Sequence, residues 1–292
     1  MALYIEQCNN YWIVKDEGYG NAIIVRTAWS SRYLNIIAKH EVKIIRLNEH
    51  AGWLDSDISF LLEIPSIHGV DILSDNVTDV SPVFRLKMLK TLSLFCKAKV
   101  AGDFAQLINL QRVGLAWRTH YSSLFSLNRL RQINIIGFPY SDLNLWNQNP
   151  NLEELRIESN NLESLSGIDR FPQIKWLNLF RCGKLKSLDA IESATSIQKL
   201  SIGRCQGILD LSPIAKLTEL KVLEIEDCRD IQSLAPVAKC RKLEMLQISG
   251  NTTVLDGDFT PLTKLPILTR VLLAQRKHYS HTASELEKIL RE

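Results

Sequence analysis

The chain has 292 residues, of which 46% are hydrophobic and 23% charged, enough to fill one or two ordinary domains without disulfide or metal staples. Its formal net charge of +3 comes from 35 basic and 32 acidic residues and singles out no class of partner. No secretory pattern opens the chain and no apolar run is long enough to span a membrane, so we expect a cytoplasmic protein without membrane contact.

Residues 1–41 are expected to form an N-terminal cap. Three short apolar segments predict strands, and the segment after them predicts a helix. The strand segments are LYIEQ, YWIVKD and NAIIVRT, and the helical segment is SSRYLNIIAKH. Such a cap is needed if a stack of repeats follows, because the first repeat would otherwise leave apolar area uncovered.

Charge is unevenly distributed over the first half of the chain. Residues 1–80 hold 6 Lys and Arg against 11 Asp and Glu, whereas residues 81–141 hold 9 Lys and Arg against the single Asp103. We call residues 85–131 the basic band. It could attract nucleic acid, with Phe95 and Trp117 available for stacking on bases, although a solvated face without a partner is the simpler interpretation.

Residues 42–273 repeat one apolar pattern about eleven times. The pattern is clearest in LKVLEIEDC: an apolar residue, two variable ones, apolar, variable, apolar, two variable, then Cys or Asn. The shortest step runs from Leu110 to Leu130, and the two longest run from Val42 to Ile67 and from Leu243 to Leu268, all within the range of known short repeats. The repeats begin at Val42, Ile67, Leu89, Leu110, Leu130, Leu152, Ile174, Ile197, Leu220, Leu243 and Leu268.

Each repeat predicts a short strand, a turn and a helical or 3₁₀ return. In LKVLEIEDC, Leu223 and Ile225 point to one side of the strand and Glu224 and Glu226 to the other. A second apolar series with helical spacing follows in every repeat. The pair Ser212-Pro213 is expected to supply an N-cap followed by proline at the first helical position. Neighbouring repeats should then pair their strands in parallel.

The ninth position of the repeat predicts a structural ladder. A side chain there should turn inward and bond backbone groups at the strand end, a role that asparagine fills well and cysteine fills as a small buried substitute. The predicted ladder residues are Asn160, Cys182, Cys205, Cys228 and Asn251. We therefore interpret the cysteines as free structural thiols in a reducing compartment, rather than as a metal or redox site.

Residues 274–292 are expected to close the other end of the stack. Thr282 and Glu285 fit a capping box, and Leu286, Ile289 and Leu290 share one face of the helix that would follow. No phosphate loop, paired cysteine motif or Ser-His-Asp arrangement can be placed in the sequence. We predict no enzyme activity, no cofactor and no metal site.

The tandem pattern resembles that of leucine-rich repeat proteins. Repeats with returns such as SPIAKLTEL resemble those of internalins and of the regulatory subunit of protein phosphatase 1. Repeats before residue 152 depart at the ninth position, where Lys97, Arg118 and Phe138 stand. The resemblance implies an α/β solenoid, a curved horseshoe with a parallel β-sheet on its concave face, short helical or 3₁₀ segments on its convex face, and caps at both ends. It also implies that the concave face binds macromolecules.

Positions 3, 5, 7 and 8 of each repeat should face the concave side. Aromatic side chains beside arginines, at positions that need not be apolar, are typical of binding hot spots. The candidate binding residues are Phe95, Trp117, Arg156, Glu158, Trp176, Asn178, Phe180, Arg181, Lys199, Arg204, Glu224, Glu226 and Asp227. The alternative for Trp176 and Phe180 is that they pack on each other as an aromatic pair of the sheet.

These observations favour a non-catalytic module that binds another protein on its concave face. A more specific hypothesis is an inhibitor, such as a bacterial immunity protein that neutralises a toxin or hydrolase. The competing hypothesis is nucleic-acid binding through the basic band, which is less favoured because outward-facing residues such as Arg85 and Lys87 dilute the band. The sequence names neither the partner nor the oligomeric state.

Overall fold

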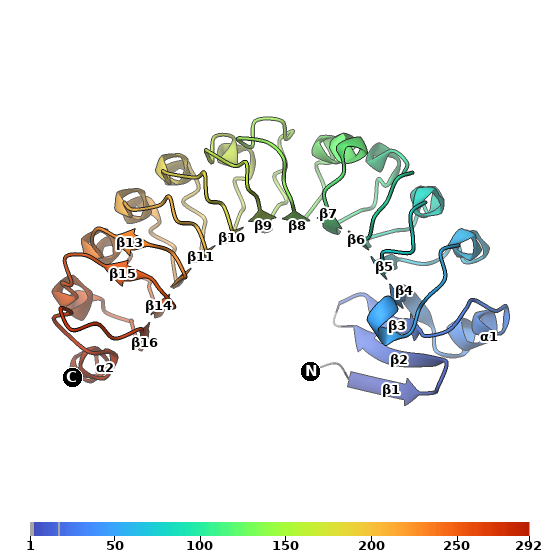
Figure 1. The fold of residues 1–292 in the computed structure, drawn as a ribbon, viewed down its shortest axis with the longest axis horizontal. Coiled ribbons are helices and arrows are strands. Elements are labelled where there is room, and N and C mark those ends of the chain that lie inside the picture. Colours follow the sequence, from blue (N-terminus) through green and yellow to red (C-terminus); the bar gives the residue numbers. More distant parts are fainter. Residues whose placement is uncertain (1–2, 17, 292) are drawn as a thin grey trace. The chain divides into compact units, whose positions relative to one another are not determined.

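The computed structural model describes residues 3–16 and 18–291 and divides into two compact units, Met1–Leu130 and Arg131–Glu292. Each unit has its own run of strands with 3₁₀ helices on the opposite side of the repeats (Figure 1). The predicted caps at residues 1–41 and 274–292 include positions 1, 2, 17 and 292, which lie outside the described residues.

The first unit begins with a three-stranded antiparallel sheet made of β1 (Leu3–Gln7), β2 (Tyr11–Asp16) and β3 (Gly20–Val25). The chain then changes to parallel pairing, because β3 pairs with β4 (Val42–Asn48) in the parallel sense. Parallel neighbours need a crossover, and helix α1 (Arg32–Lys39) supplies it.

Three further strands of this unit follow in chain order, each separated from the next by a 3₁₀ return. The strands are β5 (Gly69–Leu73), β6 (Thr91–Phe95) and β7 (Arg112–Ala116). The 3₁₀ helices are η1 (Glu49–Ala51), η2 (Ser59–Glu63), η3 (Ser81–Arg85), η4 (Phe104–Gln106) and η5 (Thr119–Ser126). Aromatic side chains fill much of the interior, among them Trp53, Phe84, Phe104 and Tyr121.

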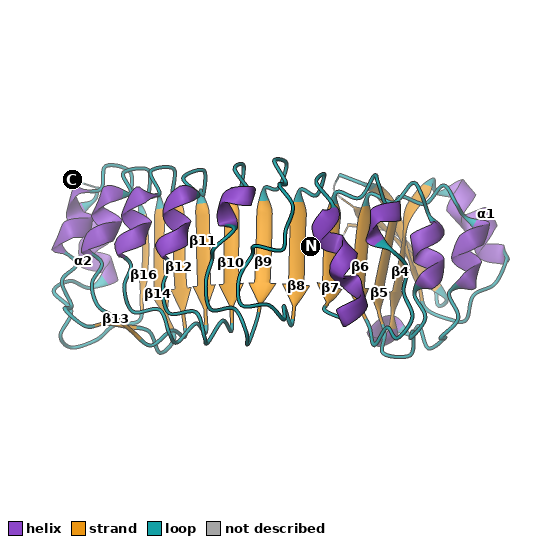
Figure 2. Cartoon of the chain, turned by 90° about the horizontal axis from the view of Figure 1, so that it is seen from above, coloured by secondary structure: helices purple, strands orange, loops and turns teal. Residues whose placement is uncertain are grey.

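The second unit repeats the strand and return more regularly. Its parallel strands are β8 (Gln132–Ile136), β9 (Glu154–Glu158), β10 (Trp176–Phe180), β11 (Lys199–Gly203), β12 (Val222–Glu226), β14 (Met245–Ser249) and β16 (Arg270–Leu273). Its returns are η6 (Ile168–Arg170), η7 (Asp189–Ser193), η8 (Ser212–Lys216), η9 (Ala235–Lys239) and η10 (Thr260–Lys264). Two-residue strands β13 (Asp230–Ile231) and β15 (Thr253–Val254) pair beside them (Figure 1). Figure 2 shows the longer strands of this unit side by side, from β8 to β16.

Equivalent residues of the repeats fall in rows across the second unit. Leu177 pairs with Leu200, Leu200 with Leu223, and Leu223 with Leu246, and all four side chains are buried. A slip of one residue would turn each of these rows toward solvent, so the apolar alternation fixes the register. The predicted fold class, a leucine-rich repeat solenoid with parallel strands and short 3₁₀ returns, is confirmed in each unit.

The prediction for the start of the return is wrong in one detail. Ser212 is the first residue of η8 and its side chain does not cap the helix; Leu211 holds the cap position. Asp210 does the bonding instead, because its Oδ1 accepts from the Ser212 backbone N–H at 2.8 Å. The hydrogen bond from the Ser212 hydroxyl, together with this one from its backbone N–H, lowers the pKa of Asp210.

The cysteines at the ninth repeat position are buried against backbone carbonyls. The thiol of Cys182 donates to Phe180 O at 3.5 Å, that of Cys205 to Gly203 O at 3.3 Å, and that of Cys228 to Glu226 O at 3.5 Å. Burial raises the pKa of Cys228, and also that of Cys240 in the core, to about 12. These two thiols are therefore neutral near pH 7, which suits packing rather than nucleophilic chemistry.

The two asparagines predicted for the ladder are exposed, and this part of the prediction is wrong. Ser159 is buried in place of Asn160, and its hydroxyl donates to Phe138 O and accepts from the Leu162 N–H. Thr252 is buried in place of Asn251, and its Oγ1 accepts from the Cys228 N–H at 3.0 Å. The inward turn comes one residue earlier or later in these repeats, so a fixed position number cannot identify it.

At the end of the second unit, helix α2 (Ala283–Ile289) begins with the predicted capping box. The Thr282 hydroxyl accepts from the Glu285 N–H, and the Glu285 carboxylate accepts from the Thr282 N–H at 2.8 Å. A second carboxylate, that of Glu287, accepts from the Val271 N–H at 3.2 Å on β16. Among the described residues, no helix has the length and apolar character needed to cross a membrane.

Candidate functional site

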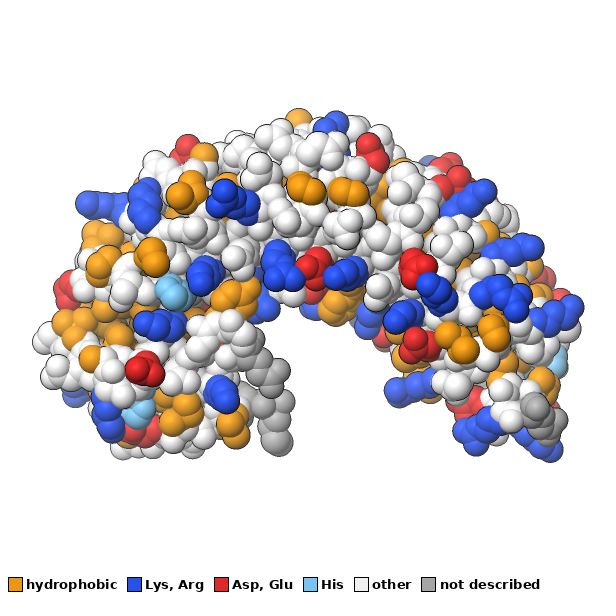
Figure 3. Space-filling model, turned by 180° about the vertical axis from the view of Figure 1, so that it is seen from behind, with side chains coloured by type: hydrophobic (Ala, Val, Ile, Leu, Met, Phe, Trp, Pro, Cys, Tyr) orange, Lys and Arg blue, Asp and Glu red, His pale blue; other side chains and the backbone are white. Residues whose placement is uncertain are grey.

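The strands of the second unit present one set of side chains on the side away from the 3₁₀ helices. Alternation along β9 to β12 places them there in rows, and we call this set the strand face. It consists of Glu154, Arg156, Glu158, Trp176, Asn178, Phe180, Lys199, Ser201, Gly203, Val222, Glu224 and Glu226. In Figure 3, Lys and Arg side chains lie next to Asp and Glu side chains along the inner edge of the second unit.

Trp176 is held between cations from both neighbouring strands. The Arg156 guanidinium lies 4.0 Å from the indole centroid and the Lys199 ammonium 4.7 Å. The indole N–H donates to the Ser201 hydroxyl at 3.3 Å, and Ser201 donates to Glu224 at 2.7 Å. These contacts fix the half-buried tryptophan in one orientation.

Phe180 lies at the other end of the same strand. It is four residues from Trp176, roughly 13 Å away at the rise of a strand, so the two rings do not pack on each other. The ring covers Gly203, its pairing partner on β11: a Cβ at Gly203 would stand 2.8 Å from Phe180 Cδ2. The Arg181 and Arg204 guanidinium carbons lie 5.2 and 5.7 Å from the ring centroid.

Every cation of this region has a carboxylate beside it. The nitrogen–oxygen distances are 2.5 Å for Arg156–Glu154, 3.0 Å for Arg181–Glu158, 2.9 Å for Lys199–Glu224 and 3.6 Å for Arg204–Asp227. All four pairs are partly exposed, and such pairs contribute about 0–1 kcal/mol each. Glu226 is exposed and forms no ion pair with another described residue. A partner could therefore exchange these contacts for its own charges at low cost.

Most of the predicted binding residues reach this region, but Trp117 does not. Its side chain is 8% exposed and stacks on Phe125, with ring centroids 5.1 Å apart and planes at 12°. The prediction is wrong because β7 ends at Ala116 and the next side chain turns into the core, where η5 supplies aromatic neighbours. Phe95 belongs to the first unit, half-buried over Gly114.

Sequence reasoning overlooked what Gly203 and Ser201 contribute. Gly203 accepts the ring of Phe180 because it has no side chain, and Ser201 connects Trp176 to Glu224. A glycine at a strand position of the repeat was a usable signal, since glycine weakens a strand unless something lies close to its backbone.

The basic band does not form one surface within the first unit. Arg85 belongs to η3 on the outer side. The Arg118 guanidinium donates to the carbonyls of Trp117 and Cys96, each at 2.9 Å. Lys97 pairs with Asp75 at 2.7 Å. Arg118 and Lys97 thus stabilise the ends of their own repeats, and Arg85 lies on the outer side, so these three cations do not share one surface.

The corresponding strand side of the first unit is partly covered by its own hairpin. Val14, Ala22 and Ile44 are buried there, and Tyr19 from the β2–β3 turn packs against them. Arg46 forms ion pairs with Asp16 on β2 and with Asp71 on β5. The Arg112 guanidinium lies 4.9 Å from the Tyr19 ring centroid.

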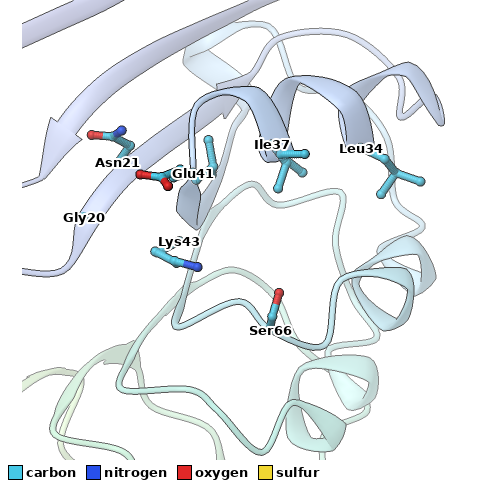
Figure 4. A pocket seen from close by; sticks show the side chains of 9 residues that line it. Gly20, Asn21, Leu34, Ile37, Glu41, Lys43 and Ser66 are labelled. Carbon is cyan, nitrogen blue, oxygen red and sulfur yellow. The ribbon is translucent and has the colours of Figure 1, made fainter.

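A pocket of about 640 Å³ lies beside α1 in the same unit (Figure 4). Leu34 and Ile37 line one side, and Asn21, Glu41 and Lys43 line the other. The amide of Asn21 is already used, because it donates to His40 O at 2.7 Å. Ser66 also lines the pocket, near the Lys43 side.

Comparisons with known proteins agree with this fold. The leucine-rich repeat domain of the endo-beta-N-acetylglucosaminidase EndoS matches residues 131–251. An internalin (inlF) of Listeria monocytogenes has a TM-score of 0.61 at 20% identity, over 79% of this chain and 66% of its own. A TDR receptor has a TM-score of 0.60 at 12% identity, over 85% of this chain and 46% of its own.

The plant peptide hormone receptor RGFR1, solved in complex with RGF2, has a TM-score of 0.55 at 16% identity, over 90% of this chain and 43% of its own. This chain thus spans less than half of the two receptors and just under two thirds of the internalin. No curated protein matches the chain. The rows of the repeats, the repeat domain matched over residues 131–251 and the similarity to these solved structures together show that the chain has a leucine-rich repeat fold similar to that of an internalin.

Proposed function

We propose that this chain is a protein-binding module and that it binds its partner with the strand face of the second unit. The observation that carries the proposal is Trp176, which Arg156 and Lys199 hold in place without burying it completely. A rigid aromatic group among arginines is the composition of a binding hot spot. Leucine-rich repeat proteins generally use the strand side of the repeat to bind other macromolecules without catalysis.

The charges of this region favour a protein partner over a nucleic acid. Its cations are Arg156, Arg181, Lys199 and Arg204, and its carboxylates are Glu154, Glu158, Glu224, Glu226 and Asp227. A nucleic-acid site needs an excess of cations along the phosphate backbone, whereas here the carboxylates outnumber the cations by five to four. A protein with its own mixture of charges can complement both signs.

The finer form of the proposal is an inhibitor that neutralises one toxin or hydrolase, as an immunity protein does, in the cytoplasm. A neutralising protein gains from a preorganised surface, because tight binding depends on small ordering costs. We propose a cytoplasmic location because the six cysteines are free and five of them are buried, which suits a reducing compartment. We also propose that the chain binds its partner without catalysing a reaction.

The test is affinity capture from the native cell extract at moderate salt. Wild-type chain is compared with a Trp176→Ala, Phe180→Ala double variant, and the retained proteins are identified. Leu54→Ala is the control, because Leu54 is an exposed apolar residue of the first unit that lies outside both the strand face and the basic band.

We expect one protein that the wild type and the control retain and the double variant loses. Capture of nucleic acid with a steep salt dependence would instead favour the basic band. Equal retention by all three chains would remove the strand face from consideration.

A further inference from the structure

Four consecutive repeats of the second unit place one residue in the left-handed backbone region just after the strand. The residues are Arg181, Arg204, Asp227 and Gly250, with φ of 52°, 53°, 49° and 65°. They are equivalent positions, because the N–H of each of the first three donates to the last residue of the next strand, at Gly203, Glu226 and Ser249. The fold therefore demands the same unusual turn four times.

Glycine and asparagine are the residues that tolerate this turn best, since a Cβ in the left-handed region crowds the following carbonyl. Gly250 meets the requirement directly. Asp227 is explained as well, because its Oδ1 accepts from the Asn251 N–H at 3.2 Å and so stabilises the next turn. Local geometry explains neither arginine.

The side chains of Arg181 and Arg204 do little for the fold. Each is 51% exposed. Arg181 pairs with Glu158 at 3.0 Å and Arg204 with Asp227 at 3.6 Å, and such exposed pairs are weak. Their remaining contact is the shared ring of Phe180. A residue in an unfavourable backbone conformation whose side chain does not stabilise the fold points to a role in binding.

We propose that Arg181 and Arg204, with Phe180 between them, recognise carboxylate side chains of an acidic peptide segment in the protein partner. This inference rests on the proposed function and names the chemistry recognised at the edge of the strand face, just after its strands. The two arginines follow adjacent strands, roughly 5 Å apart, so one segment lying across the strands can reach both. Guanidinium groups bind carboxylates with two parallel hydrogen bonds.

A carboxylate fits this site better than a phosphate does. Both arginines already bind carboxylates of the chain itself, so a partner's Asp or Glu replaces one singly charged group by another. Glu158, Glu226 and Asp227 surround the arginines, so they repel a phosphate with nearly two negative charges at one arginine more strongly than a singly charged carboxylate at the same place. The segment recognised is therefore acidic and not phosphorylated.

The first experiment follows the arginine Nε–Hε signals by NMR in the complete chain. Two capped peptides are titrated, one carrying an aspartate and a glutamate, the other carrying asparagine and glutamine in their places. Sodium chloride at matched ionic strength is the reference. We expect saturable shifts of the Arg181 and Arg204 signals with the acidic peptide alone. Equal shifts with both peptides, or with salt, would overturn the proposal.

The second experiment uses an Arg181→Asn, Arg204→Asn variant, with Arg241→Asn as a control that removes an exposed charge elsewhere. Asparagine suits the left-handed turn, so the variant should melt at the wild-type temperature or above it. Retention of the captured partner should fall about tenfold or more, because charged hydrogen bonds at the site are lost. A clearly lower melting temperature would make the arginines structural and overturn the proposal.

The two proposals fail in different ways. If the asparagine variant keeps the partner while the Trp176→Ala, Phe180→Ala variant loses it, the strand face binds the partner but not through carboxylates, and only this inference falls. If neither variant loses the partner, the proposed function falls as well.

Discussion

The two units fill the interior of the same repeat fold with different kinds of side chain. In the second unit, buried leucines stand in straight rows and cysteines follow the strands at a constant position. In the first unit, large aromatic side chains fill repeats of less regular length, and the N-terminal hairpin packs over part of the strand side. Regular repeats therefore leave a row of strand positions available for binding, whereas irregular repeats use similar positions for packing.

One repeat position makes the contrast concrete. In three consecutive repeats of the first unit the second residue is Lys43, His68 and Lys90, whereas in three consecutive repeats further along it is Arg131, Glu153 and Lys175. In the second unit the Glu153 carboxylate lies 2.5 Å from Arg131 and 3.3 Å from Lys175. Opposite charges stacked on parallel strands attract, while like charges in the same arrangement repel.

Phe104→Ala should have the largest effect on stability, since it removes one of the buried aromatic side chains that fill the first unit. The Phe104 ring meets Phe84 and Tyr121 edge to face, with centroids 5.0 and 5.5 Å apart. Removing a buried phenylalanine should lower the free energy of unfolding by about 3–5 kcal/mol, measured by urea denaturation. Ile108→Ala, at an exposed position nearby, should change it little. A loss below about 1 kcal/mol for Phe104→Ala would mean that the filling is dispensable.

Trp176→Ala should separate binding from folding in the second unit. We expect the affinity for the captured partner, measured by calorimetry, to fall by about 2 kcal/mol or more, because a rigid anchor is lost. The free energy of unfolding should change less, since the indole is half-exposed and its ion-pair neighbours retain Glu154 and Glu224. Normal affinity in a less stable chain would instead assign Trp176 to packing.

The repeat pattern predicted the strands and the face they present, because an alternation of apolar residues with a fixed period leaves one parallel arrangement. It failed where one residue is gained or lost between the strand and the turn. Asn160, Asn251 and Trp117 were each assigned from a position number, yet Ser159 and Thr252 turn inward in place of the asparagines and Trp117 itself turns inward. The left-handed turn at Arg181 was also beyond prediction, because arginine rarely adopts it.

Cys205→Ser should have a modest effect and test the regularity of the second unit. A hydroxyl can still donate to Leu179 O and Gly203 O, which accept from the thiol at 3.5 and 3.3 Å. We expect a loss of about 1 kcal/mol in the free energy of unfolding, from the cost of burying a more polar group, and unchanged partner retention. Loss of a bound metal ion in the variant, measured by elemental analysis, would contradict the structural role of the cysteines.

The smallest effect concerns pH and should belong to the first unit. Burial, Lys90 and Lys43 lower the pKa of His68 below its usual 6.5, and burial and Arg118 lower that of His120. Between the folded and unfolded pKa values the unfolded chain binds more protons, so stability is complete above pH 6.5 and falls as the pH drops through the folded values.

Glu153, whose pKa Arg131 and Lys175 lower, acts with the same sign but only below its usual value of 4.5. A His68→Gln, His120→Gln variant should therefore lose the slope of unfolding free energy between pH 7 and 5.5, a change under about 1 kcal/mol because both rings are partly solvated. A slope that persists in this variant would place the pH response outside these two histidines and remove this distinction between the units.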